Sequence, residues 1–334
     1  MTTCVRIVPL PQLGLFLLSA ALSLAVCEGV VRAFVTVRDV GPSFTVYDPA
    51  LGQRLKASFH AVRYTPEFTM TFSTNSLGRR GPEPAMSREH PILFLGDSFT
   101  MGYGVNDGEE FPALVAAELA RRGHAAPAVV NLGIGDSGQG VWVKLLRDEA
   151  PRLEPRLVVF QMFWNDPDDN LRERLFTLDP SGALRELAVP PPGVQRRVQT
   201  AIELVPGLNR LYLIGLLRQL SLRGAQPPPG PSSMAGPAGG TAPPEPGVEL
   251  TTRLVAESLE ICRRNGWPSL ALLAGLSGDL ARAAHEVFAR SGVEAIDIPG
   301  QDERPDLYYA VDVHWNAAGH RYVASRLVER LATR

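Results

Sequence analysis

Short apolar segments alternate with longer amphipathic ones from about residue 91 onward. The run Ile92–Leu95, bounded by proline and glycine, is typical of a strand buried on both faces. Similar runs predict further strands at 128–131, 156–163, 269–273 and 294–298. The segments between them have the apolar spacing of helices, at about 111–122, 141–149, 208–220, 250–265, 279–290 and 317–331. Strands that alternate with helices predict a parallel sheet covered on both faces.

The first residues form an uncharged apolar run. Residues 7–27 are rich in Leu, Ala and Val. As a helix rising about 1.5 Å per residue, the run is about 30 Å long and can cross a bilayer. A cleaved signal peptide is the alternative, but its apolar part is normally shorter, and the cleavage sites near Ala21 and Cys27 are poor. We therefore favour a single-pass anchor within residues 1–33, whose orientation the flanking arginines do not fix.

Two segments depart from the alternating pattern. Residues 34–90 contain Phe68–Ser73, where apolar and polar side chains alternate as in a half-exposed strand. We expect a small β-rich lead-in there that packs on the main domain, residues 91–334. More than half of residues 225–247 are Pro or Gly. Such a segment cannot bury enough apolar surface to order itself, so we expect a disordered insertion in the main domain.

The composition excludes some classes of function. The 334 residues carry a net charge of −2, which gives no indication of a nucleic-acid partner. Apolar residues make up 45%, enough for a full core. Cys4, Cys27 and Cys262 are scattered and show neither a disulfide nor a metal-binding pattern. Cys262 falls on the apolar side of its predicted helix and is expected in the core.

Polar residues with catalytic potential follow the predicted strands. Asp97 and Ser98 come directly after the first buried strand, at the end where open α/β sheets bind ligands, although both residue types also cap helices. Asp312 and His314 are two positions apart in the loop before the last helix, so they can point the same way. A serine nucleophile needs a base within reach, and a histidine oriented by a carboxylate provides one. Ser98, His314 and Asp312 could therefore form a triad.

Acyl transfer also needs hydrogen-bond donors aimed at the developing oxyanion. The candidates are the backbone N–H of Ser98, an N–H in the glycine-rich loop after Asn131, and the side-chain amide of Asn165, at the end of the strongest predicted strand. Asp166 is expected to brace its loop. His320 lies on the last helix and is expected to pack or to cap.

Four blocks of the chain resemble the SGNH (GDSL-like) hydrolases and occur in that family's order. They are Gly96-Asp97-Ser98, Asn131-Leu132-Gly133-Ile134-Gly135, Asn165-Asp166 and Asp312-Val313-His314. Residues 75–81 look like the lead-in of membrane-anchored members. The resemblance implies a flavodoxin-like three-layer α/β/α fold with a mainly parallel five-stranded sheet, and ester hydrolysis by Ser98, His314 and Asp312 without metal or cofactor. For an anchored chain we expect the catalytic domain on the extracytoplasmic side.

The chain departs from the family pattern at two positions and leaves alternatives open. The second block usually has its oxyanion glycine where this chain has Asp136, so the N–H of Asp136 or Gly135 would serve. The third block of the family usually reads Gly-x-Asn-Asp, and here Phe163 replaces the glycine. Trp164 and Trp315 flank the site, as walls or as core. The Asp-x-His-Trp ending also resembles enzymes that acetylate exported polysaccharides. O-acyl transfer and non-catalytic binding on the same fold are therefore alternatives to hydrolysis of a small-molecule, glycan or lipid ester.

Overall fold

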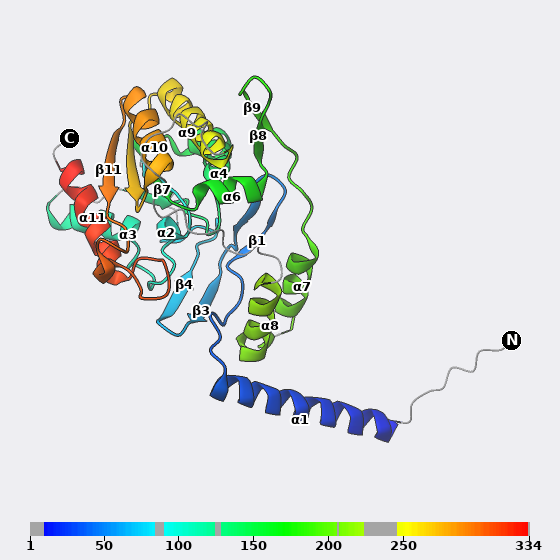
Figure 1. The fold of residues 1–334 in the computed structure, drawn as a ribbon. Helices are drawn as coiled ribbons and strands as arrows, with labels where there is room; N and C mark the ends of the chain where they lie inside the picture. Colours follow the sequence, from blue (N-terminus) through cyan, green and yellow to red (C-terminus); the bar gives the residue numbers. More distant parts are fainter. Residues whose placement is uncertain (1–9, 84–89, 124–127, 206, 224–245, 333–334) are drawn as a thin grey trace.

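A five-stranded parallel sheet forms the centre of the computed structural model (Figure 1). The structure describes residues 10–83, 90–123, 128–205, 207–223 and 246–332. The strand order is β11-β10-β7-β5-β6, and each neighbouring pair is parallel. The strands are β5 (Ile92–Leu95), β6 (Val129–Asn131), β7 (Leu157–Phe163), β10 (Ser269–Ala274) and β11 (Glu294–Ile298). From β5 the chain passes to β6 on one side and then to β7 on the other, so β5 lies at the switch point of the sheet.

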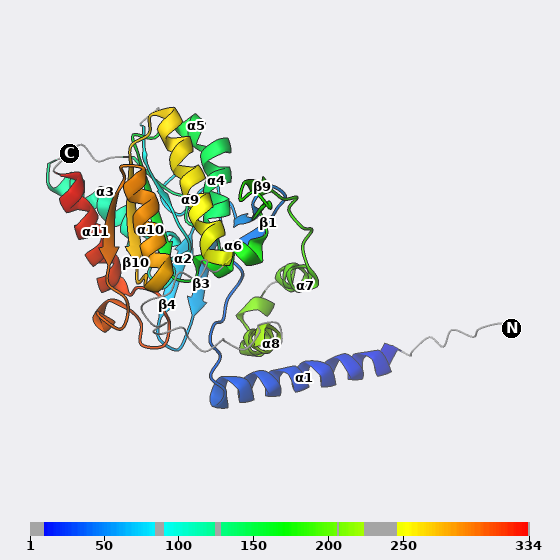
Figure 2. The same cartoon turned by 45° about the horizontal axis from the view of Figure 1, so that its top comes forward.

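Successive residues of a strand enter two separate cores, one on each face of the sheet. Leu93 and Leu95 belong to the core with α4, α9 and α10, whereas Ile92 and Phe94 belong to the core with α3 and α11. This alternation follows from the two-residue period of a strand. The expected three-layer α/β fold is therefore confirmed, and Figure 2 shows α9 and α10 in front of the sheet. The covering helices are α3 (Phe111–Arg121), α4 (Gln139–Asp148), α9 (Pro246–Asn265), α10 (Gly278–Arg290) and α11 (Ala317–Leu331).

The lead-in consists of two antiparallel hairpins that pack against the start of the main domain. Met101, from the helical turn that follows β5, is buried in the same small core as Phe44, Met70 and Phe72. The lead-in is therefore attached directly to the segment that carries Ser98. Its strands are β1 (Thr45–Asp48), β2 (Gly52–Leu55), β3 (His60–Tyr64) and β4 (Thr69–Ser73), and the helical turn is α2 (Ser98–Met101).

A long apolar helix, α1 (Leu10–Phe34), extends away from the domain (Figure 1). Its segment Gly14–Phe34 is long and apolar enough to cross a membrane, and only 6% of its most apolar stretch is buried; a signal sequence shares these features. The helix continues past Cys27, where the uncharged run ends. Its last turns contact α8 (Tyr212–Arg223), with Val31 in a small core that also includes Val37 and Val40.

Several boundaries differ from those expected. The proposed insertion lies outside the described residues except for Pro246 and Gly247, which already belong to α9. The pair Asp107 and Glu110 has the spacing of a capping box, which predicts Asp107 as the cap of α3. Asp107 does not cap α3, because its carboxylate accepts N–H groups of Ser73 and Arg80 instead. The helix expected at 208–220 is divided into η1 (Leu208–Arg210) and α8. The remaining elements were not predicted from the sequence: α5 (Ala150–Leu153), α6 (Asp166–Glu173), β8 (Phe176–Leu178), β9 (Leu184–Glu186), α7 (Val194–Glu203) and η2 (Pro305–Leu307).

Candidate active site

The chain turns sharply where β5 ends. Gly96 is required there because a Cβ atom would collide with the hydroxyl of Thr100. Asp97 then caps α2, and its Oδ1 accepts the backbone N–H of Phe99 at 2.8 Å. Ser98 is therefore the first residue of a helical turn at the carboxyl end of the switch-point strand, the place where α/β sheets bind ligands.

Ser98, His314 and Asp312 form a continuous hydrogen-bonded chain. His314 Nε2 lies 2.7 Å from Ser98 Oγ, and His314 Nδ1 lies 2.5 Å from Asp312 Oδ1. The Asp312 carboxylate also accepts the backbone N–H of His314 at 3.0 Å. A carboxylate can only accept, so Nδ1 carries the proton and Nε2 presents its lone pair to the Ser98 hydroxyl. This is the arrangement that a serine nucleophile and its base require.

The imidazole of His314 is held between aromatic rings. Its centre lies 4.9 Å from that of Phe99 and 4.8 Å from that of Tyr103. Burial by itself raises the pKa of the Asp312 carboxyl, but the hydrogen bonds from His314 and its charge outweigh burial and leave the pKa below its usual value. Asp312 is therefore ionised at neutral pH and can stabilise an imidazolium.

Glu67, in the turn between β3 and β4, supports the loop that carries Asp312. Its Oε2 accepts the backbone N–H of Asp312 at 2.7 Å, and both of its carboxylate oxygens lie near the N–H of Val311, at 3.0 and 3.1 Å. Sequence reasoning missed Glu67, because no local signal connects a turn of the lead-in with a loop 245 positions later.

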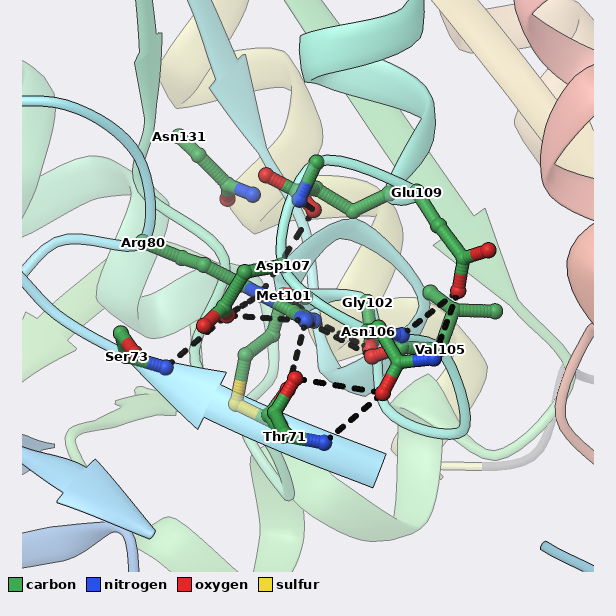
Figure 3. Close-up of polar contacts among 12 residues, drawn as sticks. Thr71, Ser73, Arg80, Met101, Gly102, Val105, Asn106, Asp107, Glu109 and Asn131 are labelled. Atoms are coloured by element: carbon green, nitrogen blue, oxygen red, sulfur yellow. Dashed lines mark hydrogen bonds and ion pairs between the residues drawn. The ribbon is translucent and has the colours of Figure 1, made fainter. Parts of the chain in front are cut away.

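Arg80 supports the segment that follows Ser98. Its guanidinium is buried and donates to the carbonyl oxygens of Met101, at 3.1 Å, and Val105, at 2.7 Å (Figure 3). It also pairs with the carboxylates of Asp107, at 3.3 Å, and the buried Glu110, at 3.6 Å. Arg80 belongs to the stretch that resembles the family's lead-in, but a hydrogen bond from it to α2 was not expected.

The second block packs against α2. Asn131 Nδ2 donates to the carbonyl of Thr100 at 2.8 Å, and its Oδ1 accepts the N–H of Gly133 at 2.9 Å. Beyond it, a Cβ atom placed on Gly135 would lie 3.7 Å from the Cβ of Ser98. Asn131 thus joins the glycine-rich loop to α2, and Gly135 borders Ser98 directly.

Three backbone N–H groups near Ser98 make no hydrogen bond to any described residue: those of Ser98, Gly135 and Asp136. Asp136 has a φ of +57°, a left-handed conformation that glycine adopts more easily than any other residue. The carbonyl oxygens of Gly135 and Asp136 accept from the Gln53 amide at 2.9 and 3.3 Å. The loop is therefore fixed through its carbonyl groups, while its N–H groups have no acceptor among the described residues.

Asn165 lies between β7 and α6, at the carboxyl end of the strand next to β5. Its Nδ2 donates to Asp169 Oδ2 at 3.0 Å, which uses one of the two amide protons. Asp166 braces the loop as expected, because its Oδ2 accepts the N–H of Phe163 at 3.0 Å and the amide of Gln139 at 2.5 Å.

Buried carboxyl groups surround this end of the sheet. Burial raises the pKa of Asp97 to about 7, of Asp169 to about 6 and of Glu173 to about 8. Burial also raises the pKa of Asp166 well above its usual value, and the charge of Asp97 adds to the effect. Near neutral pH Asp166 and Glu173 retain their protons and Asp97 does so in part, whereas Asp169 is mostly ionised; the negative charge at this end of the sheet is therefore lower than the number of carboxyl groups suggests.

The remaining candidates lie away from the hydrogen-bonded chain. His320 is fully buried, and its Nδ1 accepts the N–H of Phe111 at the start of α3, 3.2 Å away. Burial lowers the pKa of His320 to about 3, so it stays neutral. Trp315 is also fully buried and belongs to the core, whereas Trp164 is 52% exposed. Within the part of the chain that the structure describes, no group of three or more His, Cys, Asp or Glu side chains is placed to hold a metal ion.

An open parallel α/β sheet with a hydrogen-bonded Ser–His–Asp chain at its carboxyl edge has the organisation of a serine hydrolase. Residues 94–322 match the GDSL-like Lipase/Acylhydrolase family model, which covers more than half of the chain. The chain belongs to this family, and it is a hydrolase acting on esters. No curated protein gives a significant match.

Solved structures with a similar arrangement include esterases. The psychrotrophic esterase EstA from Pseudoalteromonas sp. is 11% identical, with a TM-score of 0.44 over 73% of this chain and 97% of that one. TesA is 16% identical, with a TM-score of 0.42 over 73% of this chain and 96% of that one. The acetyl xylan esterase AlAXEase is 11% identical, with a TM-score of 0.42 over 72% of this chain and 99% of that one.

Proposed function

We propose that the chain cleaves its ester through Ser98, with His314 as the base and Asp312 as the group that orients His314. The observation that carries this proposal is the pair of contacts at His314, 2.7 Å to Ser98 Oγ and 2.5 Å to Asp312 Oδ1. The nucleophile and base are within hydrogen-bond reach, and the third group fixes the tautomer.

The steps follow from this geometry. Ser98 Oγ attacks the acyl carbon while its proton moves to His314 Nε2, and the carbonyl oxygen becomes an oxyanion. His314 then gives the proton to the departing alcohol, which leaves an acyl group on Ser98. Water, activated by the same imidazole, hydrolyses the acyl-enzyme and restores the hydroxyl.

The oxyanion would be stabilised by the N–H groups near Ser98. The donors we assign are the backbone N–H of Ser98, the N–H of Gly135 or Asp136, and the free amide proton of Asn165. The absence of acceptors for the three backbone groups among the described residues supports this assignment, because preorganised donors left without a partner can bind a charge that develops during the reaction.

We also propose that α1 remains attached as a membrane anchor and that the substrate is an acyl ester of an envelope glycan or lipid. Large apolar side chains of α1, among them Leu15 and Phe16, are 67–69% exposed, which suits a helix solvated by lipid. Cell fractionation and sequencing of the mature N-terminus test the anchor. A soluble product that begins near Glu28 would contradict it.

The catalytic assignment is tested by labelling the full chain with a fluorophosphonate and mapping the adduct by mass spectrometry. We expect the adduct on Ser98, and Ser98→Ala should lower kcat by at least about a thousandfold. An active protein labelled elsewhere would refute the assignment.

An assay with p-nitrophenyl acetate, with and without a glycan acceptor, separates hydrolysis from acyl transfer. A chain that is neither labelled by the fluorophosphonate nor active in this assay would indicate a binding protein.

A further inference from the structure

The helix α7 exposes its apolar side to solvent. Val194 is 76% exposed and Val198 is 52% exposed, and Leu204 and Val205, directly after the helix, are 79% and 49% exposed. Ala201 is exposed as well. The spacing of 194, 198, 201 and 205 places these side chains in one stripe along a helix. None of the residues of α7 is buried.

The polar side of α7 faces the protein. Arg196 donates to the carbonyl of Gly52 at 3.0 Å and to the side chain of Gln53 at 2.8 Å. Glu203 accepts from the backbone N–H of Ser43 at 2.8 Å and pairs with Lys56 Nζ at 2.5 Å. A surface helix normally buries its apolar side and hydrates its polar side, so the polarity of α7 is reversed. An exposed apolar stripe of this kind marks a contact surface.

The position of α7 relative to α1 indicates what covers the apolar stripe. Glu28, in the last part of α1, accepts the backbone N–H groups of Tyr212 and Leu213 at the start of α8, both at 2.9 Å. Through η1, α8 is connected to α7. In Figures 1 and 2, α1 leaves the domain toward the side on which α7 and α8 lie. A bilayer crossed by α1 would therefore lie next to α7.

We propose that the apolar stripe of α7, formed by Val194, Val198, Ala201 and Val205, lies in the interface of the bilayer that α1 crosses. This inference rests on the proposed membrane anchorage. Arg197, at the edge of the stripe, is exposed and could meet anionic headgroups.

Contact of both α1 and α7 with the bilayer would fix the orientation of the domain, which α1 alone would not. With α1 alone, the domain could turn about the segment after Phe34. With α7 also in the interface, the domain has a fixed orientation, and the site at Ser98 keeps a constant direction relative to the lipid. The bonds of Arg196 and Glu203 make this possible, because they fix α7 to the lead-in that carries Glu67 and Arg80.

The test uses the full chain, reconstituted in vesicles of phosphatidylcholine and phosphatidylglycerol. Cys4 and Cys27 are replaced by serine, while Cys262 is buried and is retained. A polarity-sensitive fluorophore is attached at Val198→Cys, at Leu17→Cys in α1, or at Thr200→Cys. Thr200 is the matched control, because it is exposed on α7 but lies off the stripe. Lipids carrying a nitroxide near the headgroup or deep in the acyl chain are the quenchers.

At position 198 we expect a blue-shifted emission that shallow nitroxides quench more than deep ones. The fluorophore at position 200 should show the emission of a probe in water. Strong quenching at Leu17 with Val198 in water would overturn the inference and leave the anchor intact. If Leu17 is also in water, the anchorage fails together with the inference. A blue shift at Val198 that persists in detergent and is not quenched by lipid would overturn it in favour of a protein contact.

Discussion

Glu67 Oε2 lies 2.7 Å from the backbone nitrogen of Asp312 and accepts its hydrogen bond. The two residues come from different parts of the molecule, a turn of the lead-in and the last loop before α11. The lead-in therefore does more than cover the main domain, because it holds the residue that orients His314. Loss of the Glu67 carboxylate would disturb the loop of Asp312 and leave the contacts of the lead-in with the Ser98 segment in place.

We expect Glu67→Ala to lower kcat by about tenfold or more, because a misplacement near 1 Å can cost as much as a hundredfold. Glu67→Gln should keep most of the activity, since its amide oxygen can still accept the N–H groups of Asp312 and Val311. Steady-state kinetics on one ester, together with the rate of fluorophosphonate labelling, checks both variants. Equal losses in Ala and Gln would show that the charge of Glu67 matters rather than its hydrogen bonds.

Asn165→Ala should lower kcat by about 10²–10³, equivalent to about 3–4 kcal/mol, if the amide donates to the oxyanion. Asn165→Asp is the matched control for size: it replaces the donor by an acceptor and should be at least as inactive. Thermal unfolding verifies that both variants fold. An Asn165→Ala protein that keeps most of its activity would remove Asn165 from the oxyanion hole.

Asp136→Gly should be neutral or activating. It relieves the left-handed backbone at φ +57° and removes a negative charge beside the site. The measurement is kcat on the ester used for Asn165. A loss of activity would instead show that the carboxylate of Asp136 has a role of its own.

Arg80→Ala should destabilise the protein by about 3–5 kcal/mol, because it leaves the buried Glu110 without its partner. Arg80→Lys keeps the charge, but its donors sit on a single nitrogen that cannot span the separated carbonyl and carboxylate partners of the guanidinium, so its stability should fall between Ala and the parent. Arg79→Ala is the control, since Arg79 pairs with the less buried Glu149. Chemical denaturation gives the free energy of unfolding of the three variants and of the parent. A cost at Arg80 no greater than at Arg79 would contradict this role.

The raised pKa of Asp97 predicts that the free energy of unfolding depends on pH. Its pKa is about 7 in the folded chain against an ordinary value of 3.8, so the folded state binds the proton more tightly. Stability should therefore fall as the pH rises from about 4 to 7, by about 1.4 kcal/mol per unit for one proton. Asp97→Asn, which can still cap α2, should reduce this slope, whereas Asp168→Asn, on an exposed side chain, should keep it. The melting temperatures of the parent and the two variants, measured from pH 4 to 8, check this prediction. The same dependence on pH in all three proteins would exclude Asp97 as its cause.

Local patterns predicted the sheet and the last helix well. Ile92–Leu95 is apolar because both of its faces are covered, and Asn316 caps α11 by accepting the N–H groups of Ala318 and Gly319. The four blocks marked the residues that meet at the carboxyl edge of the sheet. In each case the physical cause lies within a few residues, so a single sequence displays it.

The supporting residues could not be predicted in this way. Glu67 and Arg80 act on segments far along the chain, and nothing in their own neighbourhood indicates the contact. Asp107 had the spacing of a helix cap, but the tertiary bonds to Ser73 and Arg80 took precedence. The reversed polarity of α7 is equally invisible in sequence, because periodicity shows a stripe and not what lies against it.

The distance along the chain between Ser98 and His314, 216 positions, also matters during biosynthesis. At about 5–20 residues per second, a ribosome needs roughly 10–40 s to pass from one to the other. If Ser98 is the nucleophile, as we propose, it has no base throughout that interval. Ester cleavage then cannot begin until the loop that carries His314 has been made and has packed beside Ser98.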